Sequence, residues 1–78
     1  PASVAIDAHS GLAGIAHWLN AQLAEKGIDK TYGKRSSAVM KIKEMVDAQY
    51  AAGRNTTMSD AELCEMVRQV IPGLADRF

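Results

Sequence analysis

The sequence predicts a mainly helical fold, a small three-helix domain with one short N-terminal strand or extended segment. The chain has 78 residues, of which 47% are hydrophobic and 23% charged, so it is globular with a modest core. Apolar residues recur at helical spacing in three separate runs, and capping or stop residues bound these runs. Residues 1–78 are therefore expected to be a single helical subdomain, with helices over about 11–26, 36–52 and 59–71.

The first helix is expected after an extended segment, residues 3–6, and a tight corner that ends in His9-Ser10-Gly11. Ser10 is expected to cap this helix, because a serine hydroxyl accepts hydrogen bonds from the N–H groups of a first turn. Gly27 predicts its end, in the left-handed conformation that closes a Schellman motif. The apolar stripe between them consists of Leu12, Ile15, Ala16, Leu19 and Leu23.

The second and third helices are bounded by equally local signals. Ser36 or Ser37 caps the second helix, and Gly53 ends it. The third begins with Ser59-Asp60-Ala61-Glu62, a capping box in which serine and glutamate satisfy each other's backbone N–H groups. Pro72 stops this helix, because the residue before a proline is driven out of helical geometry. The stripes are Val39, Ile42, Val46 and Tyr50 in the second helix, and Leu63, Met66, Val67, Val70 and Ile71 in the third.

Charge and cysteine content exclude several classes of function. Nine basic and nine acidic residues balance to a formal net charge of zero, whereas a dedicated nucleic-acid binder carries a basic excess. We therefore expect no nucleic-acid partner. No apolar run approaches the ~20 residues of a membrane span, so we expect no membrane partner. Cys64 is the only cysteine, which rules out an intrachain disulfide and favours a reducing, cytoplasmic location.

The corner His9-Ser10-Gly11 is the candidate functional site. A helix N-terminus with exposed amides beside a histidine suits an anion or a carbonyl oxygen. The alternative is a capped helix whose His9 lies in solvent or against a neighbouring residue and has no chemical role. Ser10 beside His9 lacks an orienting third group, so a serine nucleophile is not expected. His9 and His17 stand too far apart in sequence to share a metal on one helix, and we expect no metal site in this chain.

In their order along the chain, these elements resemble the small subdomain that follows the barrel in the 2-isopropylmalate synthase, homocitrate synthase and citramalate synthase family. There a strand enters a His-Ser-Gly corner, and two helices and an acidic-capped third helix follow. The corresponding elements here are Ile6-Asp7-Ala8-His9-Ser10-Gly11, the helices ending at Gly27 and Gly53, and the helix that begins with Ser59-Asp60-Ala61-Glu62. The match covers about Val4 to Ile71.

This resemblance implies that the chain is a non-catalytic fragment of a larger acyltransferase of amino-acid biosynthesis. That enzyme condenses acetyl-CoA with a 2-oxo acid on a metal-bearing TIM barrel. The fragment is expected to hold no cofactor, whereas the parent is expected to use a divalent metal and acetyl-CoA. The implied partners are the upstream barrel and a second subunit of the same dimeric enzyme, whose active site the subdomain covers as an accessory and communication element.

The resemblance also implies roles for individual residues. His9 would position the substrate, and Ser10 and Gly11 would lie nearest the partner's substrate site. The packing interface would include Trp18, together with Leu12 and Ile15. Leu12 departs from the pattern, because many members carry Arg or Lys after the glycine and this chain lacks that anion contact. A free-standing three-helix protein-interaction module is the alternative function, and the sequence does not choose the 2-oxo acid.

Overall fold

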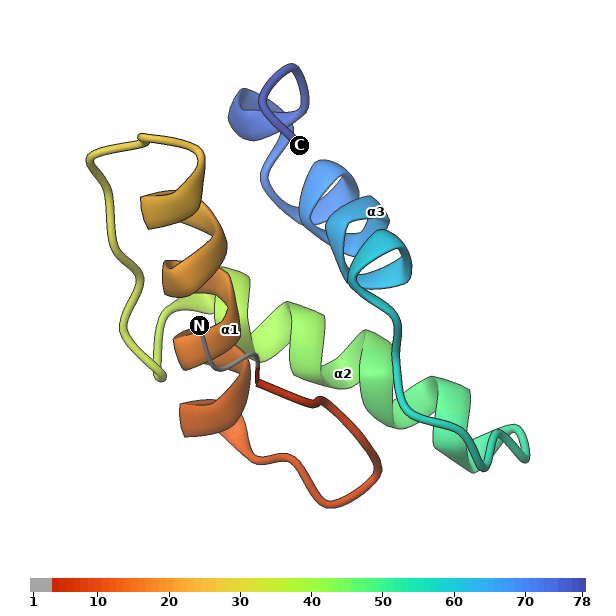
Figure 1. Ribbon diagram of the computed structural model, residues 1–78. Helices are drawn as coiled ribbons and strands as arrows, with labels where there is room; N and C mark the ends of the chain where they lie inside the picture. Colours follow the sequence, from red (N-terminus) through yellow and green to blue (C-terminus); the bar gives the residue numbers. More distant parts are fainter. Residues whose placement is uncertain (1–3) are drawn as a thin grey trace.

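The computed structural model describes residues 4–78, and within them it has three helices and a short 3-10 turn. These are α1 (Leu12–Glu25), α2 (Ser37–Ala51), α3 (Asp60–Val70) and the turn η1 (Pro72–Leu74). The predicted fold class is confirmed, and each end of each helix lies one residue inside its predicted position. Figure 1 shows α2 running across the molecule, with α1 crossing its first turns and α3 lying above it, and both α1 and α3 pack against α2.

The predicted extended segment is reduced to one isolated β-bridge. Ile6 pairs with Met58 in antiparallel fashion, and the Met58 N–H donates to the Ile6 carbonyl at 2.8 Å. Ser3, the first residue of the predicted segment, lies outside the described residues. The bridge joins the start of the chain to the residue immediately before the N-cap of α3.

The helix ends follow the sequence closely. Gly27 has a φ of 70°, and the N–H of Ile28 donates to the Leu23 carbonyl at 2.9 Å, which is the hydrogen bond that a Schellman motif requires. Gly53, with a φ of 110°, ends α2 in the same left-handed region. The predicted glycine stops are therefore confirmed.

The helix starts match the prediction for α2 and α3 but not for α1. Ser36 caps α2, and the capping box of Ser59 and Glu62 is present in full. The prediction that Ser10 caps α1 is wrong. Gly11 occupies the N-cap position, and no side chain among the described residues caps this helix.

The extended segment, all three helices and η1 contribute to one hydrophobic core. Its buried members are Ile6, Ile15, Ala16, Trp18, Leu19, Leu23, Val39, Ile42, Val46, Met58, Leu63, Met66, Val67 and Leu74. Most of the predicted stripe positions of α1, α2 and α3 are in this list. The apolar periodicity therefore located the inward face of each helix.

Two polar contacts fix how the helices and loops sit around this core. Trp18 is only 3% exposed, and its indole Nε1 donates to Asp60 Oδ1 at 2.9 Å, which links α1 to the first residue of α3. The Asn20 amide donates to the Tyr32 carbonyl and accepts from the Tyr32 N–H, both at 2.8 Å. This double contact holds the loop between α1 and α2 against α1.

We predict that Asp60→Ala lowers the free energy of unfolding by about 1–3 kcal/mol, because the buried Trp18 N–H then loses its acceptor. Asp60→Asn is the matched control, since the amide oxygen can still accept and only the charge at the helix start is lost, at a cost of about 0.3–1 kcal/mol. Urea denaturation followed by tryptophan fluorescence measures both. Equal losses in the two variants would show that the hydrogen bond contributes nothing.

Candidate functional site

The corner before α1 is a tight turn organised by Asp7. The Ser10 N–H donates to the Asp7 carbonyl at 3.1 Å, and the His9 N–H donates to Asp7 Oδ1 at 2.8 Å. The Ser10 hydroxyl accepts from the Asp7 N–H at 2.9 Å. This local bond competes with helix capping, which explains why Ser10 closes the turn instead of capping α1. Sequence reasoning missed Asp7. An aspartate can signal such a turn, because its carboxylate can accept a hydrogen bond from the backbone N–H two residues further along, here that of His9.

The turn leaves His9 exposed and Gly11 uncrowded. Gly11 has φ −93° and ψ −174°, a backbone conformation open to any residue. Apart from Gly11 itself and its two neighbours in the chain, no described atom lies within 4 Å of the position that a Cβ would take there. The fold itself therefore does not require glycine at position 11, and space next to the α1 N-terminus is open.

A small hollow of about 220 Å³ lies beside this corner. One wall is the corner, residues 7–9, and the other is the end of α2 with the loop that leads toward α3. The lining residues are Asp7, Ala8, His9, Tyr50, Arg54, Asn55, Thr56 and Thr57. His9, the predicted positioning residue, therefore faces a second polar segment that the sequence did not associate with it.

Arg54 holds this second segment in place. Its Nε donates to the Thr56 carbonyl at 3.1 Å, and its Nη2 donates to the Thr57 carbonyl at 2.7 Å. The two Nη atoms bind the Glu62 carboxylate in a bidentate pair at 2.5 and 2.7 Å, and Nη1 also reaches Gln49 Oε1 at 3.4 Å. All five N–H donors of the guanidinium therefore have acceptors. No sequence signal identified this residue, because its partners come together only in the folded chain.

The ion pair shifts the pKa of both partners. The hydrogen bond from Arg54 is the largest cause that lowers the pKa of Glu62, from 4.5 to about 2, and hydrogen bonds from the Ser59 backbone and hydroxyl add to it. The same contact with Glu62 raises the pKa of Arg54. Glu62 therefore has two structural roles, as half of the capping box and as the counter-charge of Arg54.

The predicted interface residues lie in different environments. Ile15 is fully buried and Trp18 nearly so, and both pack in the domain's own core. Leu12 is half-buried at the edge of that core, next to the corner. Of the three side chains, Leu12 keeps the most surface for a contact outside the chain.

Metal-binding clusters, the cysteine and membrane-spanning helices are the other features that bear on function. Within residues 4–78, no three His, Cys, Asp or Glu side chains are grouped so that they could hold a metal ion. Cys64 is half-buried on α3, and burial raises the pKa of its thiol, which favours the unreactive protonated form. No helix among these residues combines the length and apolar character that crossing a membrane requires.

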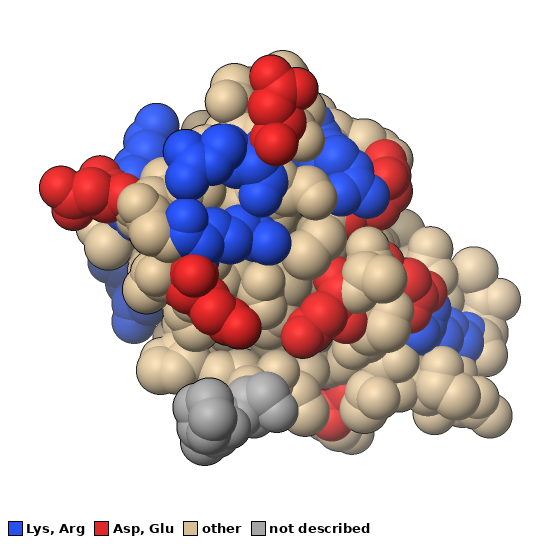
Figure 2. Space-filling view, turned by 45° about the horizontal axis from the view of Figure 1, so that its top comes forward, with Lys and Arg blue, Asp and Glu red and all other residues tan. Residues whose placement is uncertain are grey.

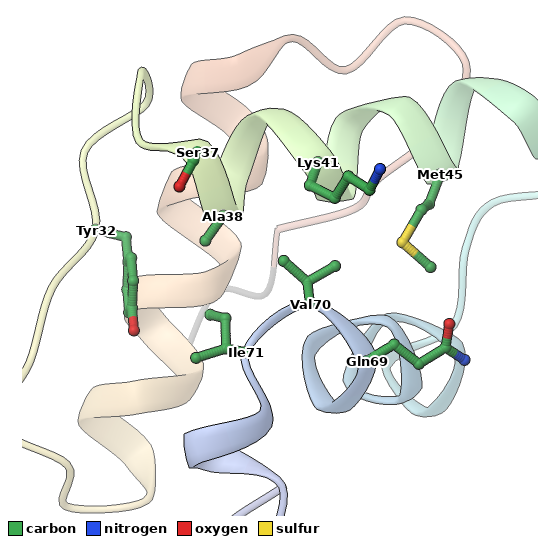
Figure 3. Close-up of a pocket in the computed structure, with 8 residues that line it drawn as sticks. All are labelled: Tyr32, Ser37, Ala38, Lys41, Met45, Gln69, Val70 and Ile71. Atoms are coloured by element: carbon green, nitrogen blue, oxygen red, sulfur yellow. The ribbon is translucent and has the colours of Figure 1, made fainter.

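A larger hollow is a groove on another part of the molecule. It has a volume of about 750 Å³ and lies between α2 and the end of α3, with Tyr32 at one end (Figure 3). Met45, Val70 and Ile71 make much of its wall apolar, and Lys41 lies along it. A neighbouring hollow of about 560 Å³ also has Met45 and Gln69 in its wall.

In Figure 2, basic and acidic side chains lie beside one another across one face of the molecule.

Comparison with curated proteins finds two similar relatives. Over 77 residues the chain is 39% identical to a citrate (Re)-synthase of Clostridium kluyveri. This alignment covers 99% of this chain and 17% of the relative. Over 65 residues the chain is 42% identical to a citrate (Re)-synthase of Syntrophus aciditrophicus. This alignment covers 83% of this chain and 10% of the relative. The chain thus spans less than a fifth of either relative. No family model matches it, and no solved structure matches it significantly.

The relatives agree in part with the resemblance found from the sequence. They are synthases and much longer than this chain, as expected for the parent enzyme. Their name specifies citrate, whereas the resemblance was to synthases of 2-isopropylmalate, homocitrate and citramalate. The chain is therefore homologous to one segment of a synthase.

We predict that the stability of the chain falls as the pH drops from about 4.5 to about 2. Because the pKa of Glu62 is lowered in the folded state, the unfolded chain takes up this proton first. The contribution of Glu62 is complete above pH 4.5 and is lost as the pH approaches 2. Glu62→Gln removes the titrating group, so its free energy of unfolding should fall less steeply across this window.

Urea denaturation at a series of pH values measures this slope. Glu44→Gln is the control, since Glu44 is an exposed glutamate of α2 for which residues 4–78 show no ion pair. Its slope should equal that of the unaltered chain. A Glu62→Gln slope as steep as that of the control would contradict the prediction.

Proposed function

We propose that this chain is an accessory segment of a larger acyltransferase that forms citrate from acetyl-CoA and a 2-oxo diacid. The observation that carries the proposal is the 39% identity to a citrate (Re)-synthase across 99% of the chain. Citrate is oxaloacetate with a two-carbon acetyl unit added at its carbonyl carbon. The acetyl-CoA donor implied by the sequence resemblance therefore fits, with oxaloacetate as the acceptor: the new carbon–carbon bond joins the acetyl methyl carbon to the oxaloacetate carbonyl carbon, and water cleaves the thioester to release citrate and free CoA.

In this proposal the corner before α1 covers the substrate site of a second subunit, while the barrel and its divalent metal belong to the rest of the enzyme. Three properties of the corner support that role. His9 is exposed, and its imidazole can donate or accept a hydrogen bond. The α1 N-terminus has no side-chain cap among the described residues, so its first-turn amides remain available to a carboxylate or carbonyl oxygen. Gly11 leaves room for close approach.

A protein-interaction module is the alternative function, and the groove between α2 and α3 is the observation that favours it. An open, largely apolar groove between two helices is the kind of surface in which an amphipathic helix binds. This alternative requires no chemistry from His9 or from the corner. The two functions therefore differ in whether the protein that carries this chain condenses acetyl-CoA.

The decisive experiment is an acceptor comparison with the full-length protein that carries this chain. Acetyl-CoA is supplied with oxaloacetate, pyruvate, 2-oxoglutarate or 2-oxoisovalerate, and release of the CoA thiol and the product acid are measured. We expect citrate formation with oxaloacetate to exceed turnover with each other acceptor. Preference for another acceptor would contradict the proposed substrate, and no CoA release with any acceptor would favour the interaction module.

We predict that His9→Ala lowers kcat of this enzyme at least tenfold, because a positioned acid–base or polarising group typically contributes ~10²–10⁴-fold. The free energy of unfolding should change little, since His9 is exposed and its only hydrogen bond among the described residues is made by its backbone. Steady-state kinetics and urea denaturation measure the two quantities. Unchanged kcat would mean that the corner is a structural turn.

Gly11→Ala supplies a matched control for close approach. Replacing glycine by alanine at an N-cap costs on the order of 0.5–1 kcal/mol, and the reduced freedom of the unfolded chain returns about 0.4–1 kcal/mol. The stability of the fold should therefore change by less than about 0.5 kcal/mol. A large loss of activity with unchanged stability is expected if another part of the enzyme packs against Gly11, and full activity would contradict that contact.

A further inference from the structure

We propose that Arg54 is a positioning residue for His9, acting through the backbone of the loop formed by Asn55, Thr56 and Thr57. The inference rests on the proposed function for its kinetic consequence, and on the hydrogen bonds of the described residues for its geometry. Arg54 does not contact substrate in this scheme. It fixes the wall of the small hollow that His9 faces.

Arg54 has no donor left for a ligand. Its five N–H groups are all used by protein acceptors, and its side chain is only 17% exposed. Two of the acceptors, the Thr56 and Thr57 carbonyls, belong to the loop backbone. The Tyr50 hydroxyl also donates to the Thr56 carbonyl, at 2.5 Å. An arginine with this set of contacts holds backbone in place and does not bind an incoming anion.

Chain connections and hydrogen bonds hold the loop at both of its ends. Arg54 is the residue directly after Gly53, at the end of α2. Met58, directly after the loop, donates its N–H to Ile6, the residue before the corner turn. Glu62 anchors the other side of the guanidinium to the first turn of α3. The corner and the loop are thereby held opposite each other across the hollow.

The loop presents uncharged polar side chains to the hollow. Asn55, Thr56 and Thr57 are exposed residues with uncharged hydrogen-bonding side chains, and they line the hollow together with His9. Charge in the loop region is balanced, because Arg54 is paired with Glu62. On the side opposite Asp7 and His9, the loop therefore offers neutral donors and acceptors, whose positions depend on how the backbone of Thr56 and Thr57 is held.

Lysine cannot take over this role. It has three donors on a single nitrogen, whereas Arg54 reaches four different residues with a planar fork. Arg54→Lys keeps the charge opposite Glu62 and loses the contacts to the loop. Arg68→Lys is the matched control, because Arg68 also binds a glutamate of α3, Glu65, through Nη2 at 2.6 Å, but does not line the hollow.

The test is a double-mutant cycle on the full-length enzyme. The kcat is measured for the enzyme without substitutions, for His9→Ala, for Arg54→Lys and for the double variant. We expect Arg54→Lys to lower kcat roughly tenfold when His9 is present and less than about twofold when His9 is absent. Arg68→Lys should leave kcat unchanged in both backgrounds. Tyr50→Phe removes only one bond to the Thr56 carbonyl, so it is a milder variant that should reproduce the dependence on His9 with a smaller loss.

Thermal unfolding of every variant is followed by circular dichroism, and kinetics are compared at a temperature where all of them are folded. Equal losses from Arg54→Lys with and without His9 would overturn the inference and leave the proposed function intact. Full activity of Arg54→Lys or of Tyr50→Phe would also overturn it. Full activity of His9→Ala alone would instead refute the role of the corner in the proposed function, and the inference would fall with it.

Discussion

The arrangement of the candidate site depends on a single backbone hydrogen bond, from the Met58 N–H to the Ile6 carbonyl at 2.8 Å. The corner turn follows Ile6 directly. The polar loop that faces this turn across the small hollow directly precedes Met58. Both residues are also buried in the core, Ile6 almost completely. The bridge therefore sets the separation of two exposed segments from a position inside the hydrophobic cluster, where apolar packing on both sides keeps water from competing for the bond.

Sequence reasoning located the helices well because their signals are local. Gly27 and Gly53 end helices through backbone geometry that a left-handed residue provides by itself, and the Ser59 capping box needs only residues within one turn. Ser10 is the instructive failure. Its hydroxyl could accept a hydrogen bond either from an N–H of the first turn of α1 or from the Asp7 N–H. The residue type alone did not distinguish these two donors.

The site was predictable only in half. The exposed corner with His9 follows from a short motif, so the sequence could identify it. The opposite wall could not be found in this way, because Arg54 acquires its role from Glu62, Gln49 and the loop carbonyls, which meet only in the folded chain. Trp18 shows the same limit, since an aromatic residue beside an apolar stripe fits both a core and an outer surface until its partner, Asp60, is known.

The way the helices pack has a consequence for the order in which the chain folds. α1 and α2 are neighbours in sequence and pack directly on each other, as do α2 and α3, so most packing closes short loops. The bridge between Ile6 and Met58 spans most of the chain and closes a far longer loop, at a greater cost in chain entropy. It is therefore expected to form late in folding, after neighbouring helices have packed. The two walls of the small hollow are therefore brought together only at the end of folding, once the core that buries Ile6 and Met58 has assembled around the bridge.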